Sequence, residues 1–102
     1  MAENFNVTSD DHTTSITINS SLDMNSAEQL LDVMKQAGES DLDIEVDASQ
    51  VEAVSTACYQ ILLATNLSAQ KKGHRFDIKK SSEKFVAGLS ELGLRDMFKK
   101  AE

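Results

Sequence analysis

A chain of 102 residues, 40% hydrophobic and 26% charged, has the composition of one globular domain with a single core, and we expect one domain over residues 1–102. Its formal net charge of −7 disfavours binding to polyphosphate, so no nucleic-acid partner is expected. No segment approaches the roughly 20 apolar residues that span a bilayer, and residues 1–4 lack the pattern of a signal peptide. The sequence therefore predicts a cytoplasmic protein that does not insert into membranes.

Alternation of apolar and polar residues predicts a β-hairpin at the beginning of the chain. Phe5 and Val7 precede a polar turn at residues 9–12, and Ile16 and Ile18 follow it. The next segment predicts a helix, which we expect Gly38 to end. Its apolar residues recur at three- and four-residue spacing and comprise Ala27, Leu30, Leu31, Val33, Met34 and Ala37.

Residues 41–47 alternate strictly and predict a third strand with one apolar face and one face of carboxylates. Such a face indicates exposure to solvent on that side, or a strand at the edge of the sheet. A metal site is not expected there, because alternate residues on a strand are spaced more widely than one ion requires.

A second helix is predicted to begin near Thr56 and to end before a turn at Gly73. A fourth strand at residues 75–79 and a third helix capped by Ser81 or Ser82 follow. Apolar residues expected to pack inward are Tyr59, Ile61, Leu62, Leu63 and Leu67 in the second helix and Phe85, Val86, Leu89 and Leu92 in the third, which should stop near Gly93; Leu94, Met97 and Phe98 then form a short helical turn.

The predicted order of elements is ββαβαβα with a short C-terminal helical turn. Helices that connect successive strands indicate parallel strand pairs, and the initial hairpin adds an antiparallel one. The sequence thus predicts an α/β fold with a mixed β-sheet covered by helices.

Few residues carry a pattern that indicates catalysis or a cofactor. The four glycines are scattered and form no phosphate loop. His12 and His74 fall in turns without a second ligand at metal-binding spacing, so we expect both to be ordinary surface residues. Cys58 has no second cysteine to pair with and lies within an apolar helix, where a small buried side chain is expected. We therefore expect neither an enzyme nor a bound metal or cofactor.

Two hydroxyl side chains, Ser55 and Thr56, stand where a polar loop gives way to the second helix. The N–H groups at a helix start have no intrahelical partner and carry partial positive charge. A hydroxyl there caps the helix or, when phosphorylated, gains stabilising contacts. Residue chemistry alone favours the simple cap.

The segment VSTACYQILLA at residues 54–64 resembles the signature of STAS domains. In that family it commonly reads as an apolar residue, Asp, Ser or Thr, Ser or Ala, Gly or Ala, Leu, Gln or Gly, and three aliphatic residues. The resemblance extends to the order of elements, to the Leu22-Asp23 pair, and to the LGLRDMF segment at residues 92–98, which is similar to the family's G-L-x-x-x-F ending.

The resemblance implies a non-enzymatic regulator similar to bacterial anti-sigma-factor antagonists. In such proteins, a partner-switching kinase phosphorylates a Ser or Thr at the start of this helix, and the unmodified form binds the kinase and releases its sigma factor or other client. By this comparison, the residues expected to contact a partner are Leu22, Asp23, Met24, Asn25, Ser55, Thr56, Ala57, Tyr59 and Gln60.

Two positions depart from the family pattern. Ser55 replaces the usual Asp, and Ala57 stands at the position most often phosphorylated in the sporulation-type antagonists. Thr56 is then the first candidate for phosphorylation and Ser55 the second.

Two alternative functions stay open. The chain resembles constitutive STAS subunits of lipid or anion transport complexes, or of chemotaxis and two-component signalling assemblies, in which Thr56 makes a permanent contact. A small-ligand binder, with a groove near the start of the second helix, is the third possibility, because that helix end suits anions.

Overall fold

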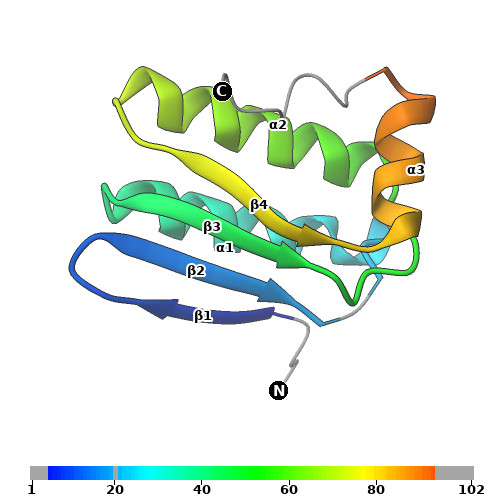
Figure 1. Ribbon diagram of the computed structural model, residues 1–102, viewed down its shortest axis with the longest axis horizontal. Helices are drawn as coiled ribbons and strands as arrows, with labels where there is room; N and C mark the ends of the chain where they lie inside the picture. Colours follow the sequence, from blue (N-terminus) through cyan, green and yellow to red (C-terminus); the bar gives the residue numbers. More distant parts are fainter. Residues whose placement is uncertain (1–4, 20, 94–102) are drawn as a thin grey trace.

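The computed structural model describes residues 5–19 and 21–93, so the closing turn expected at residues 94–98 lies outside the described residues. Its elements follow the predicted order ββαβαβα, with one added 3₁₀ turn before the first helix (Figure 1). They are β1 (Phe5–Ser9), β2 (Thr13–Ile18), η1 (Met24–Ser26), α1 (Ala27–Glu39), β3 (Asp43–Ala48), α2 (Thr56–Lys71), β4 (Phe76–Ser81) and α3 (Glu83–Glu91).

The four strands form one mixed sheet in the order β1-β2-β3-β4. The hairpin pair β1 and β2 is antiparallel, while β2 with β3 and β3 with β4 are parallel, as predicted. In the hairpin turn, the Asp10 carboxylate accepts hydrogen bonds from the N–H groups of His12 and Thr13, each at 2.8 Å. These bonds, with that from His12 the larger contribution, lower the pKa of Asp10.

One face of the sheet forms the core. Ile16 stands opposite Val46, and Ile44 stands opposite Phe76, and all four side chains are buried. The helices α1 and α2 contact one another and pack on these residues, and α1 lies behind the sheet in Figure 1. This burial of alternate strand residues is the main term that holds the sheet to the helices.

The carboxylates of β3 lie on the opposite face of the sheet. Asp43, Glu45 and Asp47 are partly exposed, which agrees with the predicted solvent-facing side. The alternative position at the sheet edge is wrong, because β3 pairs with β2 on one side and β4 on the other. The polar row therefore belongs to the interior strand of a sheet whose second face is polar.

The first helix does not end at Gly38 as predicted. It continues to Glu39, and the chain turns only at Asp41, whose φ of 63° is in the left-handed region. An Asp tolerates this conformation better than most residues other than glycine. The Ser40 hydroxyl donates to the Ala37 carbonyl at 2.7 Å, which satisfies one of the free carbonyls at the helix end. The third strand begins accordingly at Asp43 rather than at Asp41.

Three leucines that the helical patterns placed inward are on the surface. Leu31, Leu67 and Leu92 are 44%, 49% and 42% exposed. In α2 the side that faces the core carries Cys58, Tyr59 and Leu62 instead, and apolar residues continue around the helix. A pattern that is apolar on several sides does not specify which side is buried.

The third helix is attached to α2 through Tyr59. Its hydroxyl donates to the Phe85 carbonyl at 2.7 Å, and the two rings lie 5.4 Å apart between centroids. Ser82 caps α3 by accepting the Phe85 N–H at 3.1 Å, which confirms one of the two predicted caps. Within residues 5–19 and 21–93, none of the helices has the length and apolar character that a membrane crossing requires.

Candidate functional site

The start of α2 is capped by Ser55. Its backbone is extended, with φ −77° and ψ 158°, and its side-chain oxygen accepts the N–H of Cys58 at 3.3 Å. The Ser55 carbonyl accepts the N–H groups of Cys58 and Tyr59 at 3.1 and 3.2 Å. Ser55 is thus the N-cap that the sequence predicted, and its hydroxyl is engaged in holding the helix start.

Thr56 is the first residue of α2, and its side chain is exposed. Gln60 is exposed one turn further along the same helix, while Ala57 between them is partly buried. The N–H groups in this first turn lack intrahelical acceptors, so the surroundings of Thr56 carry partial positive charge. Of the two adjacent hydroxyls, that of Thr56 is therefore the accessible one.

The α2 start is joined by backbone hydrogen bonds to the segment that precedes α1. The Leu22 N–H donates to the Ala53 carbonyl, and the Ser55 N–H donates to the Leu22 carbonyl, both at 2.7 Å. Leu22 and Val54 form a parallel bridge between these bonds. The Cys58 thiol also lies 3.5 Å from the Asp23 carbonyl. Two segments more than 30 residues apart in the sequence are thereby fixed side by side.

A short turn orders the residues that follow Leu22. The Asp23 carboxylate accepts the N–H and the hydroxyl of Ser26 at 3.1 and 3.2 Å, and η1 begins at Met24. Asp23 and Asn25 are exposed next to the α2 start. We call the exposed and partly exposed residues of these two joined segments the docking surface: Asp23, Asn25, Ser55, Thr56, Ala57 and Gln60.

Two of the predicted partner contacts belong to the core instead. The Leu22 side chain is fully buried, and Tyr59 is 2% exposed with its hydroxyl bound to Phe85. Neither side chain can reach a partner in this structure, so their inclusion in the site is corrected. They support the docking surface from below, Leu22 through its backbone bonds and Tyr59 through its packing.

Cys58 is buried, as predicted. Burial raises the pKa of its thiol above the usual 9.0, and the nearby Asp23 charge adds a smaller contribution in the same direction, while hydrogen bonds from Ser55 oppose it. The buried thiol fills space beneath the docking surface.

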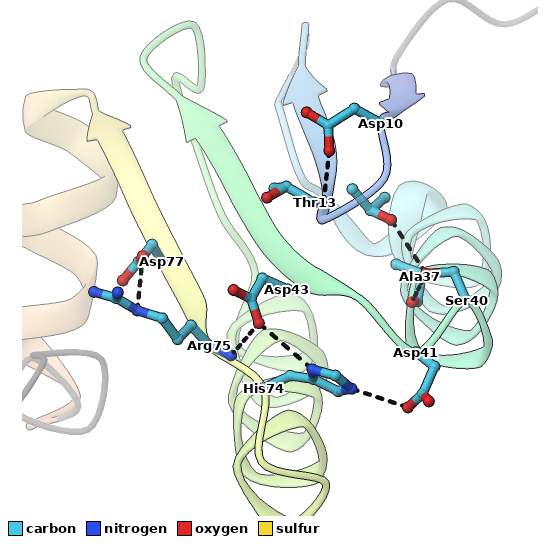
Figure 2. Close-up of polar contacts among 10 residues, drawn as sticks. Asp10, Thr13, Ala37, Ser40, Asp41, Asp43, His74, Arg75 and Asp77 are labelled. Carbon is cyan, nitrogen blue, oxygen red and sulfur yellow. Dashed lines mark hydrogen bonds and ion pairs between the residues drawn. The ribbon is translucent and has the colours of Figure 1, made fainter.

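His74 is not the isolated surface residue that its sequence context indicated. Its ring nitrogens face two carboxylates, with Nε2 2.9 Å from Asp41 and Nδ1 3.5 Å from Asp43 (Figure 2). Asp43 also accepts the N–H of Arg75 at 3.0 Å. This cluster fastens the end of the α1–β3 turn to the segment that enters β4. Among the described residues, no group of three His, Cys, Asp or Glu side chains is arranged to hold a metal ion.

The backbone joint at Ala53 and the contacts of His74 were not found from the sequence. Backbone bonds leave no residue-type signal, and the His74 partners lie more than 30 positions earlier in the chain. The unusual conformation of Asp41 that brings its carboxylate to His74 also has no marker in the sequence.

A comparison with protein-family models matches residues 5–99 to the family described as "Mlab, STAS domain". A search of curated proteins finds no match. Solved structures with a similar fold include the unphosphorylated anti-sigma-factor antagonist SpoIIAA, at 15% identity and a TM-score of 0.78, over 96% of this chain and 88% of that one.

Two further structures show the same fold. An anti-sigma-factor antagonist from Mycobacterium paratuberculosis aligns at 20% identity and a TM-score of 0.81, over 92% of this chain and 80% of the other. The phosphorylated form of the Bacillus cell-fate determinant SpoIIAA aligns at 15% identity and a TM-score of 0.72, over 96% and 91%. At such low identity these likenesses establish the architecture.

Proposed function

From the match over residues 5–99, this chain belongs to the STAS domain family, and we propose that it is a non-enzymatic regulator that binds a protein partner reversibly through the docking surface. The observation that carries the proposal is the pair of 2.7 Å hydrogen bonds that join residue 22 to residues 53 and 55. They hold the exposed polar side chains of both segments in one rigid patch. A preformed patch binds with a smaller entropy cost than a mobile loop.

The partner we propose is a kinase-type anti-sigma factor or another signalling protein. That partner would bind either this chain or its own client protein, but not both at once. The anti-sigma-factor antagonists with the same fold support this class of partner. The patch contributes hydroxyl, amide and carboxylate groups, and a polar surface of this kind suits an exchangeable complex better than a permanent one.

Thr56 is the proposed phosphorylation site. Its hydroxyl is exposed, whereas that of Ser55 accepts the Cys58 N–H, and Ala57 has no hydroxyl. A phosphate at a helix start is favoured by the local N–H groups, so it would leave α2 intact. It would also add nearly two negative charges at the centre of the docking surface, which opposes binding to an acidic or apolar partner surface.

The test uses the full chain with the proposed partner, a kinase-type anti-sigma factor from the same genome. Incubation with that kinase and ATP, followed by mass spectrometry, should place phosphate on Thr56. Calorimetric titration should show that Thr56→Glu weakens the complex by about tenfold or more, as expected when a charge is placed in an interface. Ser90→Glu, an exposed site on α3 with the same charge change, should bind as the unmodified chain does. Equal losses in the two variants, or binding unchanged by Thr56→Glu, would contradict the proposal.

A constitutive subunit of a transport or signalling complex is the second candidate. Ala57 favours it, because an alanine stands where the sporulation-type antagonists accept phosphate. In that case the native protein would carry no phosphate on Thr56 or Ser55, and Thr56→Ala would still weaken the complex. Phosphate on Thr56 in the native protein would exclude this second function.

A further inference from the structure

A groove of about 580 Å³ lies between α1 and α2. Two of its lining residues, Ala57 and Gln60, also belong to the docking surface. Its walls are mainly apolar and include Leu31 and Met34 from α1 and Ile61 and Ala64 from α2. Small residues, among them Gly38 and Ala57, keep the two helices from closing it with side chains. Leu31 is 44% exposed there, so apolar surface remains uncovered in this chain.

The groove follows most of the length of α2. On α2 its lining residues extend from Ala57 to Lys72, which corresponds to a length of roughly 22 Å at the helical rise per residue. A volume of about 580 Å³ lies within the roughly 300–1,000 Å³ that is typical of small-molecule sites. The groove therefore has room for one hydrocarbon chain.

The length also fits a single chain. A bilayer core of about 30 Å holds two acyl chains end to end, so a groove of roughly 22 Å holds one such chain together with its head group. Burying the chain against Leu31, Met34 and Ile61 would remove apolar surface of both ligand and protein from water.

Two lysines place positive charge at one end of this groove. Lys35 and Lys72 line it near the C-terminal end of α1, and the Lys72 ammonium donates to the Gly38 carbonyl at 3.1 Å. Neither lysine has an ion-pair partner within residues 5–19 and 21–93. An ammonium has three donors, so Lys72 can bind a further acceptor.

The other charged groups at this end set limits on the ligand. His74 also lines the groove, but its ring is already placed between Asp41 and Asp43 (Figure 2). Glu39 is the one carboxylate among the groove's lining residues and disfavours an anion nearby. With Glu39 in the lining and Asp41 and Asp43 beside His74, the two lysines favour a head group with one negative charge over one with two.

We propose that the groove between α1 and α2 binds one free fatty acid, with its alkyl chain along Leu31, Met34 and Ile61 and its carboxylate at Lys72 and Lys35. The site is separate from the proposed phosphorylation of Thr56 and does not require it. Ala57 and Gln60 border both the groove and the docking surface, so the two sites are neighbours.

The test is calorimetric titration of the full chain with dodecanoate and with shorter homologues, each below the concentration at which it forms micelles. One equivalent should bind, and each added methylene should tighten binding by about fourfold. Dodecanol, which has the same chain and no charge, should bind more weakly than dodecanoate. Absence of saturable binding, or equal binding of the acid and the alcohol, would overturn the proposal.

Matched variants locate the ligand. Lys72→Gln should weaken binding of dodecanoate by about three- to fivefold, the size expected for an exposed ion pair. Lys71→Gln is the control, because it removes the same charge one residue away and Lys71 does not line the groove; this variant should bind dodecanoate as the unmodified chain does. Glu39→Gln should tighten binding, and Ala64→Phe should abolish it by filling the groove. Equal effects of the two lysine variants, or unchanged binding in a folded Ala64→Phe, would contradict this placement. Cosedimentation with phosphatidylglycerol vesicles but no binding of free dodecanoate would show a membrane-surface site instead and would also overturn it.

Discussion

Gly88 in α3 is the position where a single methyl group should reveal the role of Tyr59. A Cβ built at Gly88 would overlap the Tyr59 hydroxyl oxygen and would stand 2.8 Å from the Cζ atom that carries it. In Gly88→Ala the tyrosine ring must therefore move, and its hydrogen bond to the Phe85 carbonyl must lengthen or break.

The magnitude follows from three contributions. Alanine gains about 1 kcal/mol over glycine in a helix interior. Forcing a methyl group into a packed site costs about 1–3 kcal/mol, and loss of a buried hydrogen bond costs about 1–2 kcal/mol. We expect Gly88→Ala to lower the free energy of unfolding by about 1–4 kcal/mol, and Tyr59→Phe alone to lower it by about 1–2 kcal/mol.

The double variant makes the test specific. In Tyr59→Phe the overlapping hydroxyl is absent and the hydrogen bond is already lost, so adding Gly88→Ala should cost less than it does in the unmodified chain. The two effects should fall short of their sum by about 1 kcal/mol. Urea unfolding followed by circular dichroism measures all four proteins. If Gly88→Ala were as stable as the unmodified chain, or the two changes were additive, the contact of Tyr59 with α3 would be wrong and an outward-facing Tyr59 would have to be reconsidered.

Three further predictions concern the supports of the fold. Ser55→Ala should lower the free energy of unfolding by about 1 kcal/mol because it removes the α2 cap, whereas Thr56→Ala should change it little. Thermal unfolding of the two variants measures this difference, and equal losses of stability would contradict the assignment of Ser55 as the cap. Because burial raises the pKa of Cys58, its contribution to the free energy of unfolding is complete below the unfolded pKa near 9.0 and is lost as the pH rises through the higher folded pKa. The alkaline decline in stability should therefore be smaller in Cys58→Ala. A thiol reagent at pH 8 should react with the folded chain only after urea is added. The lowered pKa of Asp10 predicts the opposite direction, a contribution present above pH 3.8 and lost as the pH falls through the folded value; carboxyl NMR titration should show Asp10 titrating below 3.8, and a value at or above 3.8 would contradict the turn geometry.

The fold was predictable because several kinds of signal agree along the chain. Strict alternation at Ile44 and Val46 marks a strand, and the hydroxyls of Ser55 and Ser82 mark helix starts. The family resemblance at residues 54–64 indicates that these strands and helices belong to one known fold. Each prediction rests on a local pattern, and the family match over residues 5–99 and the topology confirm the architecture.

The site was predictable only in part, because it depends on which way side chains point. The family comparison places Leu22 and Tyr59 in the site, yet both side chains are buried, and for Tyr59 the apolar pattern of the second helix alone predicts this inward position. Leu31 and Leu67 are exposed because a helix that is apolar on several sides does not specify which side faces the core. Backbone bonds such as that from Leu22 to Ala53 have no residue signature, so the joint between the two segments appears only in three dimensions.

Hydrogen–deuterium exchange of the full chain, alone and in the proposed complex with a kinase-type anti-sigma factor from the same genome, tests the central claim most directly. We predict that binding slows exchange in residues 22–26 and in residues 53–60, the two segments that the backbone bonds join. The polar sheet face at residues 43–47 and 77–80 should exchange as it does in the free chain. Protection confined to that sheet face, with the two joined segments unchanged, would contradict the assignment of the docking surface.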